Sequence, residues 1–171
     1  MYRPAPPPTT PPEPSIIAEG KIDNFGSWTL DENSLLTIDG RGDMPNWSRQ
    51  KEAPASPWGS VYEKIKSISI SDSVTSIGED AFDRCSNLHE ITIPNSVVRV
   101  GRNAFRNCTS LTKVDIPNHI SEIDNGTFSG CISLTQITIP NSITRIGAFA
   151  FFECKSLRHI SIPYGIRKIG A

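Results

Sequence analysis

The sequence has no excess of charge of either sign and no long apolar run. Its 171 residues include 17 Lys and Arg against 18 Asp and Glu, which gives a net charge of −1 at pH 7. Such a balance lacks the positive field that draws proteins to nucleic acid or to an anionic membrane. The apolar stretches hold only a few residues each, far fewer than the roughly 20 that span a bilayer. We therefore expect neither nucleic-acid binding nor membrane insertion.

Recognisable secretory, catalytic and cofactor motifs are also missing. Met1 is followed by Tyr-Arg-Pro without the apolar h-region of a signal peptide. This start does not decide the cellular compartment, because a fragment that begins after its signal peptide would have the same start. The sequence holds no Gly-rich phosphate loop, no His-Glu-x-x-His and no paired carboxylates. His89, His119 and His159 have no recurring nucleophile beside them. We expect no catalysis, no cofactor and no catalytic residue.

The four cysteines argue against a metal site. They recur singly at long and equal intervals, each between a phenylalanine and a leucine, whereas zinc ligands come in close pairs such as C-x₂₋₄-C. Disulfides between stacked neighbours are an alternative, but one column repeated down a stack favours inert thiols. We interpret the cysteines as buried small hydrophobes.

A repeat with a period of 23 organises most of the chain. From Val74 the sequence divides into four full rows, at 74–96, 97–119, 120–142 and 143–165, and the remainder of the chain begins a fifth. Such a period is typical of a solenoid or a propeller, and a unit this short cannot hold the four strands of a propeller blade. Five columns are identical in all four rows: Phe82/Phe105/Phe128/Phe151, Cys85/Cys108/Cys131/Cys154, Leu88/Leu111/Leu134/Leu157, Ile93/Ile116/Ile139/Ile162 and Pro94/Pro117/Pro140/Pro163.

Within one row the pattern predicts two short strands and a turn. Residues 91–94, Ile-Thr-Ile-Pro, alternate with period 2 until proline ends the strand. The second apolar pair, Val97 and Val100, lies three residues apart and is followed by Gly101. This pattern predicts a shorter strand or extended turn, which ends at the glycine, on the opposite wall. The segment Ala-Phe-x-x-Cys-x-x-Leu favours a helical or 3₁₀ turn that places Phe, Cys and Leu inside. Stacking about five such coils creates the core, so we predict a right-handed, mainly β solenoid.

The chain divides into three segments by composition. Residues 1–15 hold seven of the fourteen prolines and predict an extended spacer, favoured over an SH3 ligand because PxxP matches arise by chance in any proline run. Residues 16–64 carry all three tryptophans, Trp28, Trp47 and Trp58, and predict an N-terminal cap whose indole N–H groups face solvent. Residues 65–171 are the repeats.

Both ends of the repeat array carry a partial row. The partial row before Val74 contains Ile65, Ile68 and Ile70, which lie 23 residues before Leu88, Ile91 and Ile93 of the first full row. In this partial row Gly59 stands at the phenylalanine position. In the cap, apolar and polar residues alternate over 28–30 and again over 36–38, and a polar segment separates the two stretches. This pattern predicts a β-hairpin. At the other end the chain stops early in a new row, at Ala171. We expect either a longer array or self-association through this end.

The row consensus V-x-x-I-G-x-x-A-F-x-x-C-x-x-L-x-x-I-x-I-P-x-S resembles the BspA-like leucine-rich repeat family, found mainly in bacterial cell-surface proteins. The resemblance covers residues 65–171, and the segment 28–47 with Pro57-Trp58 is similar to the region that precedes such repeats in secreted members. Asp124, Thr127 and Tyr164 depart from the consensus and affect local turn geometry. The resemblance implies a secreted or cell-surface location and adhesion to host or matrix proteins.

The candidate binding residues are the polar positions that alternate with the buried strand residues. They form two columns of side chains at fixed pitch, and we expect this face to bind a protein ligand. A structural spacer or self-assembly module is the alternative, and the recognition arm of a longer enzyme is a more distant one. The first column is Ser67, Glu90, Lys113, Gln136 and His159, and the second is Ser69, Thr92, Asp115, Thr138 and Ser161.

Arg41-Gly42-Asp43 spells the tripeptide that integrins recognise. It lies within Thr-Ile-Asp-Gly-Arg-Gly-Asp-Met-Pro, where turn chemistry in the cap nearly generates the triplet by itself. We therefore treat these three residues as a weak candidate site.

Overall fold

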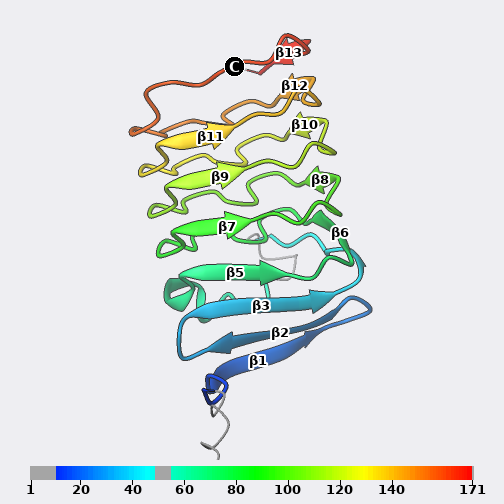
Figure 1. The fold of residues 1–171 in the computed structure, drawn as a ribbon, viewed down its shortest axis with the longest axis vertical. Coiled ribbons are helices and arrows are strands. Elements are labelled where there is room, and N and C mark those ends of the chain that lie inside the picture. Colours follow the sequence, from blue (N-terminus) through cyan, green and yellow to red (C-terminus); the bar gives the residue numbers. More distant parts are fainter. Residues whose placement is uncertain (1–10, 49–54, 171) are drawn as a thin grey trace, which may run out of the picture.

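The computed structural model describes residues 11–48 and 55–170 and shows a solenoid of stacked coils (Figure 1). Each coil lies on the one before it, from the blue N-terminal strands to the red C-terminal end. The predicted fold class is therefore confirmed. Residues 1–10 of the predicted spacer lie outside the described residues.

A seven-stranded sheet forms one wall of the solenoid. Its order is β1-β2-β3-β5-β7-β9-β11, and β1, β2 and β3 pair antiparallel whereas every later pair is parallel. The predicted hairpin is confirmed as β2 and β3, and β1 adds a third antiparallel strand that we did not predict. The strand bounds are β1 Ile16–Ile22, β2 Gly26–Asp31, β3 Leu35–Gly40, β5 Ser67–Ile70, β7 Glu90–Thr92, β9 Lys113–Asp115 and β11 Gln136–Thr138.

In the full rows, strands β7, β9 and β11 of this sheet each end two residues before the proline column. β7 ends at Thr92, and the next two residues are Ile93 and Pro94. Proline has no N–H for the next step of the ladder, and the chain turns there, where the N–H of Val97 donates to the Pro94 carbonyl at 3.0 Å.

Two short parallel sheets form a second wall, where the sequence predicted shorter strands. One contains β4, β6 and β8, and the other contains β10, β12 and β13. Partners again occupy the same position in successive rows, as Ser76 pairs with Arg99 and Glu122 with Arg145. The strand bounds are β4 Gly42–Asp43, β6 Val74–Ile77, β8 Arg99–Val100, β10 Glu122–Ile123, β12 Arg145–Ile146 and β13 Lys168–Ile169.

The third wall, which we call the turn wall, comprises residues 78–88, 101–111, 124–134 and 147–157. It consists of hydrogen-bonded turns, and the predicted inward placement of Phe82, Cys85 and Leu88 is confirmed, but the turns do not join into a 3₁₀ or α-helix. Asp80 and Arg84 have φ of +52° and +66°, a left-handed conformation that interrupts any helix. Isolated backbone hydrogen bonds close the turns, such as the one from the Cys85 N–H to the Phe82 carbonyl at 3.2 Å. The side chains of Phe82 and Cys85 point inward and are fully buried. Within the described residues, the one 3₁₀ helix is η1 at Tyr62–Lys64.

The phenylalanine column forms a continuous stack of nearly parallel rings through the core. Ring centroids lie 5.4 Å apart for Phe82 and Phe105, 5.7 Å for Phe105 and Phe128, and 5.8 Å for Phe128 and Phe151. The first three rings are buried, and Phe151 in the last full row is half-buried. Spacings of this size are favourable for aromatic pairs.

Trp58 extends this stack into the cap. Its ring lies 5.4 Å from Phe82 at an angle of 17°, so Trp58 occupies the column position that alignment assigned to Gly59. Trp28 and Trp47 meet Trp58 edge-on at 6.3 Å and 5.2 Å. All three rings are buried. The Trp58 indole N–H donates to the Ala81 carbonyl at 2.7 Å, so the expectation that it faces solvent is wrong.

The cysteine column consists of thiols without disulfides, as predicted. Cys85, Cys108 and Cys131 are buried and Cys154 is half-buried. The thiols of Cys108, Cys131 and Cys154 donate to the phenylalanine carbonyl of the preceding row at 3.1–3.2 Å. Burial raises the pKa of Cys108 and Cys131 and raises that of Cys154 to about 11.

We expect Cys154 to react first with Ellman's reagent in the folded protein, and the other three thiols only after unfolding. The thiolate is the nucleophile, and Cys154 is both the most exposed and the least perturbed of the three shifted thiols. Stopped-flow absorbance of native protein and of Cys154→Ser measures this order. Native labelling of the remaining cysteines at the rate of Cys154 would contradict a closed thiol column.

Candidate functional site: the exposed sheet face

Strand pairing brings the predicted polar columns together. Ser67, Glu90, Lys113 and Gln136 are successive register partners across β5, β7, β9 and β11. In the second column, Thr92, Asp115 and Thr138 are register partners in the same way. The predicted residues on these strands are exposed except for Ser67, which is half-buried, and they alternate with inward-facing residues such as Ile91 and Val114.

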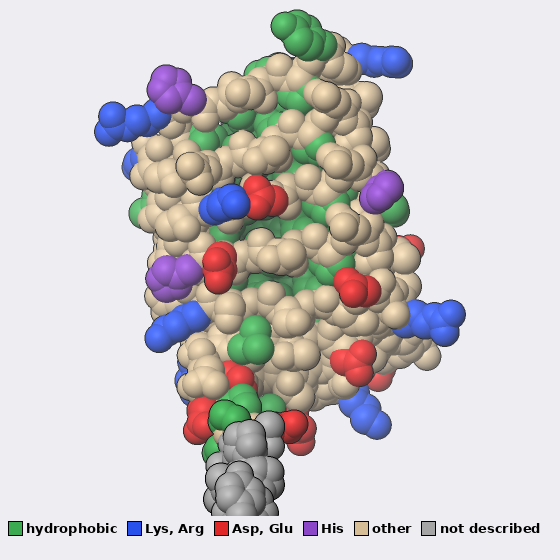
Figure 2. Space-filling view, in the orientation of Figure 1, with side chains coloured by type: hydrophobic (Ala, Val, Ile, Leu, Met, Phe, Trp, Pro, Cys, Tyr) green, Lys and Arg blue, Asp and Glu red, His purple; other side chains and the backbone are tan. Residues whose placement is uncertain are grey.

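The last row of the predicted face has a different setting. His159 and Ser161 are exposed, but they lie beyond β11 in a segment that forms no strand. We call the ten predicted residues together the sheet face. Figure 2 looks onto this side of the molecule and shows few charged side chains at its centre, with hydrophobic atoms recessed between polar ones.

An ion pair joins the two columns at the middle of the sheet face. Lys113 Nζ lies 2.8 Å from Asp115 Oδ2, and Thr138 Oγ1 donates to Asp115 Oδ1 at 3.2 Å. The hydrogen bond from Lys113 lowers the pKa of the Asp115 carboxyl below its ordinary value. Both side chains are more than half exposed, so the pair contributes little to folding. These charges therefore stay accessible to a ligand.

The cap lengthens the second column, which the sequence did not reveal. Thr37 on β3 pairs with Ser69 on β5, and Thr29 on β2 pairs with Thr37. The period-2 alternation of the hairpin was visible in the sequence, but the register of the hairpin strands against the repeat strands could not be deduced from it. Hydroxyl side chains thus continue from the repeats into the cap.

A shallow groove borders the second column. Its volume is about 390 Å³, and it follows the Ile-Pro turns of two successive rows. Ile93, Pro94, Ile116 and Pro117 are buried and provide an apolar floor. The polar lining residues are Asp72, Thr92, Asn95, Asp115 and Asn118. A ligand would thus meet an apolar floor beside exposed carboxylates and amides, of which Asp115 is held by Lys113 and Thr138.

The Arg41-Gly42-Asp43 triplet lies on another wall. Gly42 and Asp43 form β4 in a sheet with β6 and β8, and Gly42 has a φ of +80°. Asp43 Oδ1 accepts a hydrogen bond from Thr75 Oγ1 at 2.7 Å, and this bond lowers the Asp43 pKa. Integrin recognition here stays a hypothesis, which loss of cell attachment in Asp43→Glu would support.

The described part of the chain gives no sign of a metal centre or a spanning helix. No group of three His, Cys, Asp or Glu residues there is arranged to hold a metal ion. No helix in those residues is long and apolar enough to cross a membrane. The three histidines are exposed on separate rows.

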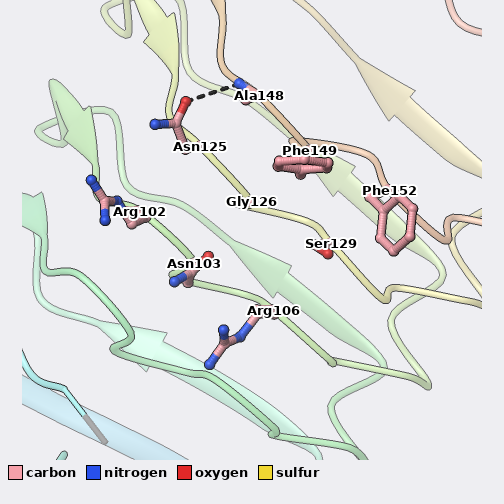
Figure 3. Close-up of a pocket in the computed structure, with 9 residues that line it drawn as sticks. All are labelled: Arg102, Asn103, Arg106, Asn125, Gly126, Ser129, Ala148, Phe149 and Phe152. Atoms are coloured by element: carbon pink, nitrogen blue, oxygen red, sulfur yellow. Dashed lines mark hydrogen bonds between the residues drawn. The ribbon is translucent and has the colours of Figure 1, made fainter. Parts of the chain in front are cut away.

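Sequence reasoning missed a second groove, on the turn wall. Phe149 and Phe152 are exposed there, opposite Arg102 and Arg106 (Figure 3). The available signal was a break in a column, because Phe149 occupies the position of Asp80, Asn103 and Gly126 in the earlier rows.

Comparison with known proteins identifies the repeat. Six copies of the BspA type leucine-rich repeat region match residues 61–171. The chain belongs to this family. A comparison with curated proteins finds no match. Leucine-rich repeats of this kind generally mediate protein–protein interactions and are typically not catalytic.

Solved structures of bacterial leucine-rich repeat proteins share the fold. A leucine-rich repeat protein from Bacteroides ovatus is 27% identical with a TM-score of 0.57, covering 95% of this chain and 37% of its own. A leucine-rich cell surface protein from Faecalibacterium prausnitzii is 25% identical with a TM-score of 0.52, covering 90% and 50%. A T. pallidum leucine-rich repeat protein, 24% identical with a TM-score of 0.60, covers 90% and 82% and shows likeness of fold. The BspA-type chain thus spans about a third to a half of the first two proteins.

Proposed function

We propose that this BspA-type repeat is the protein-binding module of a secreted or cell-surface protein and that it adheres to host or matrix proteins through the sheet face. The observation that carries the proposal is the in-register pairing of β5, β7, β9 and β11, which fixes polar side chains in two straight columns. Membership of a family whose repeats mediate protein interactions supports it.

The chemistry of the sheet face favours a weak contact that gains strength through multiple copies. The columns have no aromatic or arginine anchors, which are the usual hot spots of tight interfaces. Lys113 and Asp115 can exchange their mutual contact for opposite charges on a ligand, while the adjacent Ile-Pro groove accepts an apolar side chain. Several modules displayed on one surface would raise the effective affinity without any new contact.

Charge reversal at the centre of the sheet face tests this proposal. We expect Lys113→Glu and Asp115→Lys each to weaken capture of the matrix protein that the parent binds by about tenfold or more. Each change places two like charges side by side and removes one charge that a ligand meets. Surface plasmon resonance on immobilised collagen, laminin, fibronectin and fibrinogen measures capture.

Two controls make the result specific to the sheet face. Lys155→Glu makes the same charge change at an exposed position on the turn wall and should leave capture unchanged. The double exchange Lys113→Asp with Asp115→Lys restores an ion pair but reverses its direction, and it should also lose capture. If the sheet-face variants bind as well as the parent, or if the parent captures none of the four proteins, the proposal fails.

A self-assembly module is the second candidate function. Ile162, Tyr164 and Ile169 are exposed in the last rows, a density of apolar surface that a stacked copy would cover. Sedimentation of the parent and of the same sheet-face variants separates the two functions. Self-assembly without matrix capture would favour this second candidate.

A further inference from the structure

The turns of three successive rows line an open groove on the turn wall, away from the sheet face. Its volume is about 490 Å³, within the usual range for small-ligand sites. Phe149, Phe152 and Ala148 line one side, and Arg102, Asn103 and Arg106 line the other (Figure 3). The row between them supplies Asn125, Gly126 and Ser129. The small residues of the middle row thus leave a hollow between an aromatic side and a polar side.

Phe149 is placed there at a cost to folding. Its φ is +57°, and the matching positions hold Asp80, Asn103 and Gly126 at +52° to +64°. Gly, Asn and Asp tolerate this left-handed conformation, whereas a bulky residue is strained in it. The Phe149 side chain is also 62% exposed, so it gains little from burial. Residues held in strained backbone conformations cluster at functional sites.

Phe152 completes the aromatic side of the groove. It is 55% exposed, and its ring meets that of Phe149 edge-on with centroids 5.9 Å apart. The same position in the earlier rows holds Asp83, Arg106 and Ser129, so the fold does not require an aromatic residue here. The pair presents apolar ring surface to the groove.

The opposite side is polar and held in place. Arg106 donates to both carboxylate oxygens of Asp83, at 3.1 and 3.0 Å, and its Nη2 lies 3.9 Å from Asp80 Oδ1. The two carboxylates together compensate the charge of the guanidinium group. The Asn103 side chain fills the space that a Cβ at Gly126 would need, so glycine keeps the amide close to the floor. Asn125 Oδ1 accepts the N–H of Ala148 at 2.9 Å, which orients the amide of Asn125. Arg102 is exposed at the same side.

These two sides select a ligand with one apolar face and a hydrogen-bonding edge. A fully apolar side chain would desolvate the amides and guanidinium groups without pairing them. A polyanion would find the Arg106 charge already compensated by two carboxylates. A pyranose ring matches both sides, because its C–H face stacks on a phenyl ring while its hydroxyls pair with amides and guanidinium groups. We propose that this groove binds a pyranose residue of a glycan.

Saturation-transfer NMR on the intact chain tests the groove directly. The probes are the methyl glycosides of glucose, galactose, N-acetylglucosamine and glucuronic acid, which separate neutral from acidic sugars. We expect transfer to the ring C–H protons of at least one glycoside, and we expect Phe149→Asn and Phe152→Ser each to abolish it. Arg102→Gln should weaken it, most of all if glucuronide is the preferred probe.

The same variants separate a binding role from a structural one. Phe149→Asn installs the residue that Asn103 provides two rows earlier, so relief of strain should raise the unfolding midpoint by about 2–4 °C while binding is lost. Lys113→Glu on the sheet face should leave sugar binding intact, so this proposal can fail or succeed independently of the sheet-face one. Absence of transfer from all four glycosides would overturn the proposal, as would unchanged transfer in Phe149→Asn or a fall in its unfolding midpoint.

Discussion

Phe105→Ala should lower the free energy of unfolding by about 3–5 kcal/mol, because it leaves a cavity in the middle of the ring stack. Phe105 is fully buried and contacts a stacked phenylalanine on each side, Phe82 and Phe128. In a solenoid each coil is stabilised by its two neighbours, so a gap in a central row weakens both interfaces. Urea denaturation followed by far-UV circular dichroism measures the loss.

Phe151→Ala is the matched control for this change. Phe151 belongs to the same column, but it is half-buried and its one stacked phenylalanine is Phe128. We therefore expect a clearly smaller loss of stability than for Phe105→Ala. Equal losses in the two variants would show that the column does not act as a stack with a buried centre.

Trp58→Ala should destabilise the protein by about as much, roughly 3–5 kcal/mol, through loss of the cap. The indole ring covers Phe82, receives the edges of Trp28 and Trp47, and donates its N–H to the Ala81 carbonyl. Without it the first phenylalanine of the stack is exposed to water. Thermal unfolding monitored by circular dichroism measures the effect.

Trp58→Phe separates the two contributions of the indole ring. A phenyl ring keeps the stacking on Phe82 but leaves the buried Ala81 carbonyl without its donor, a loss of about 1–3 kcal/mol. If Trp58→Phe is as unstable as Trp58→Ala, the hydrogen bond and not the stacking dominates the cap. If Trp58→Ala unfolds at the parent's midpoint, the interpretation of this segment as a cap is wrong.

The repeat fold was predictable because one period fixes both strand pairing and core. A shift of one row along the sequence puts Lys113 beside Glu90 and Phe105 beside Phe82, and the structure pairs them in that way. The conformation of the turn wall was not predictable from that period. A spacing of three suits a 3₁₀ turn as well as it suits turns broken by left-handed residues, and residues as different as Asp80, Arg84 and Phe149 adopt the left-handed form.

The position of Trp58 in the cap and the second groove could not be predicted from the sequence for a related reason. Alignment by period assigned the phenylalanine position to Gly59, but the chain between Trp58 and Ile65 does not follow the repeat, and the neighbouring Trp58 reaches the stack. The groove depends on small residues in the row at Gly126 and Ser129, with exposed rings in the row after it. Periodicity describes what rows share, whereas this groove depends on how they differ.

Site-specific photo-cross-linking tests most directly whether the sheet face binds the ligand. A benzoylphenylalanine at Gln136, on the sheet face, is compared with one at Lys155, on the turn wall, in the presence of the matrix protein that the parent captures. The sheet-face proposal predicts a covalent adduct from position 136 and none from position 155. An adduct from position 155 alone, or no adduct from position 136 under conditions of full capture, would contradict it.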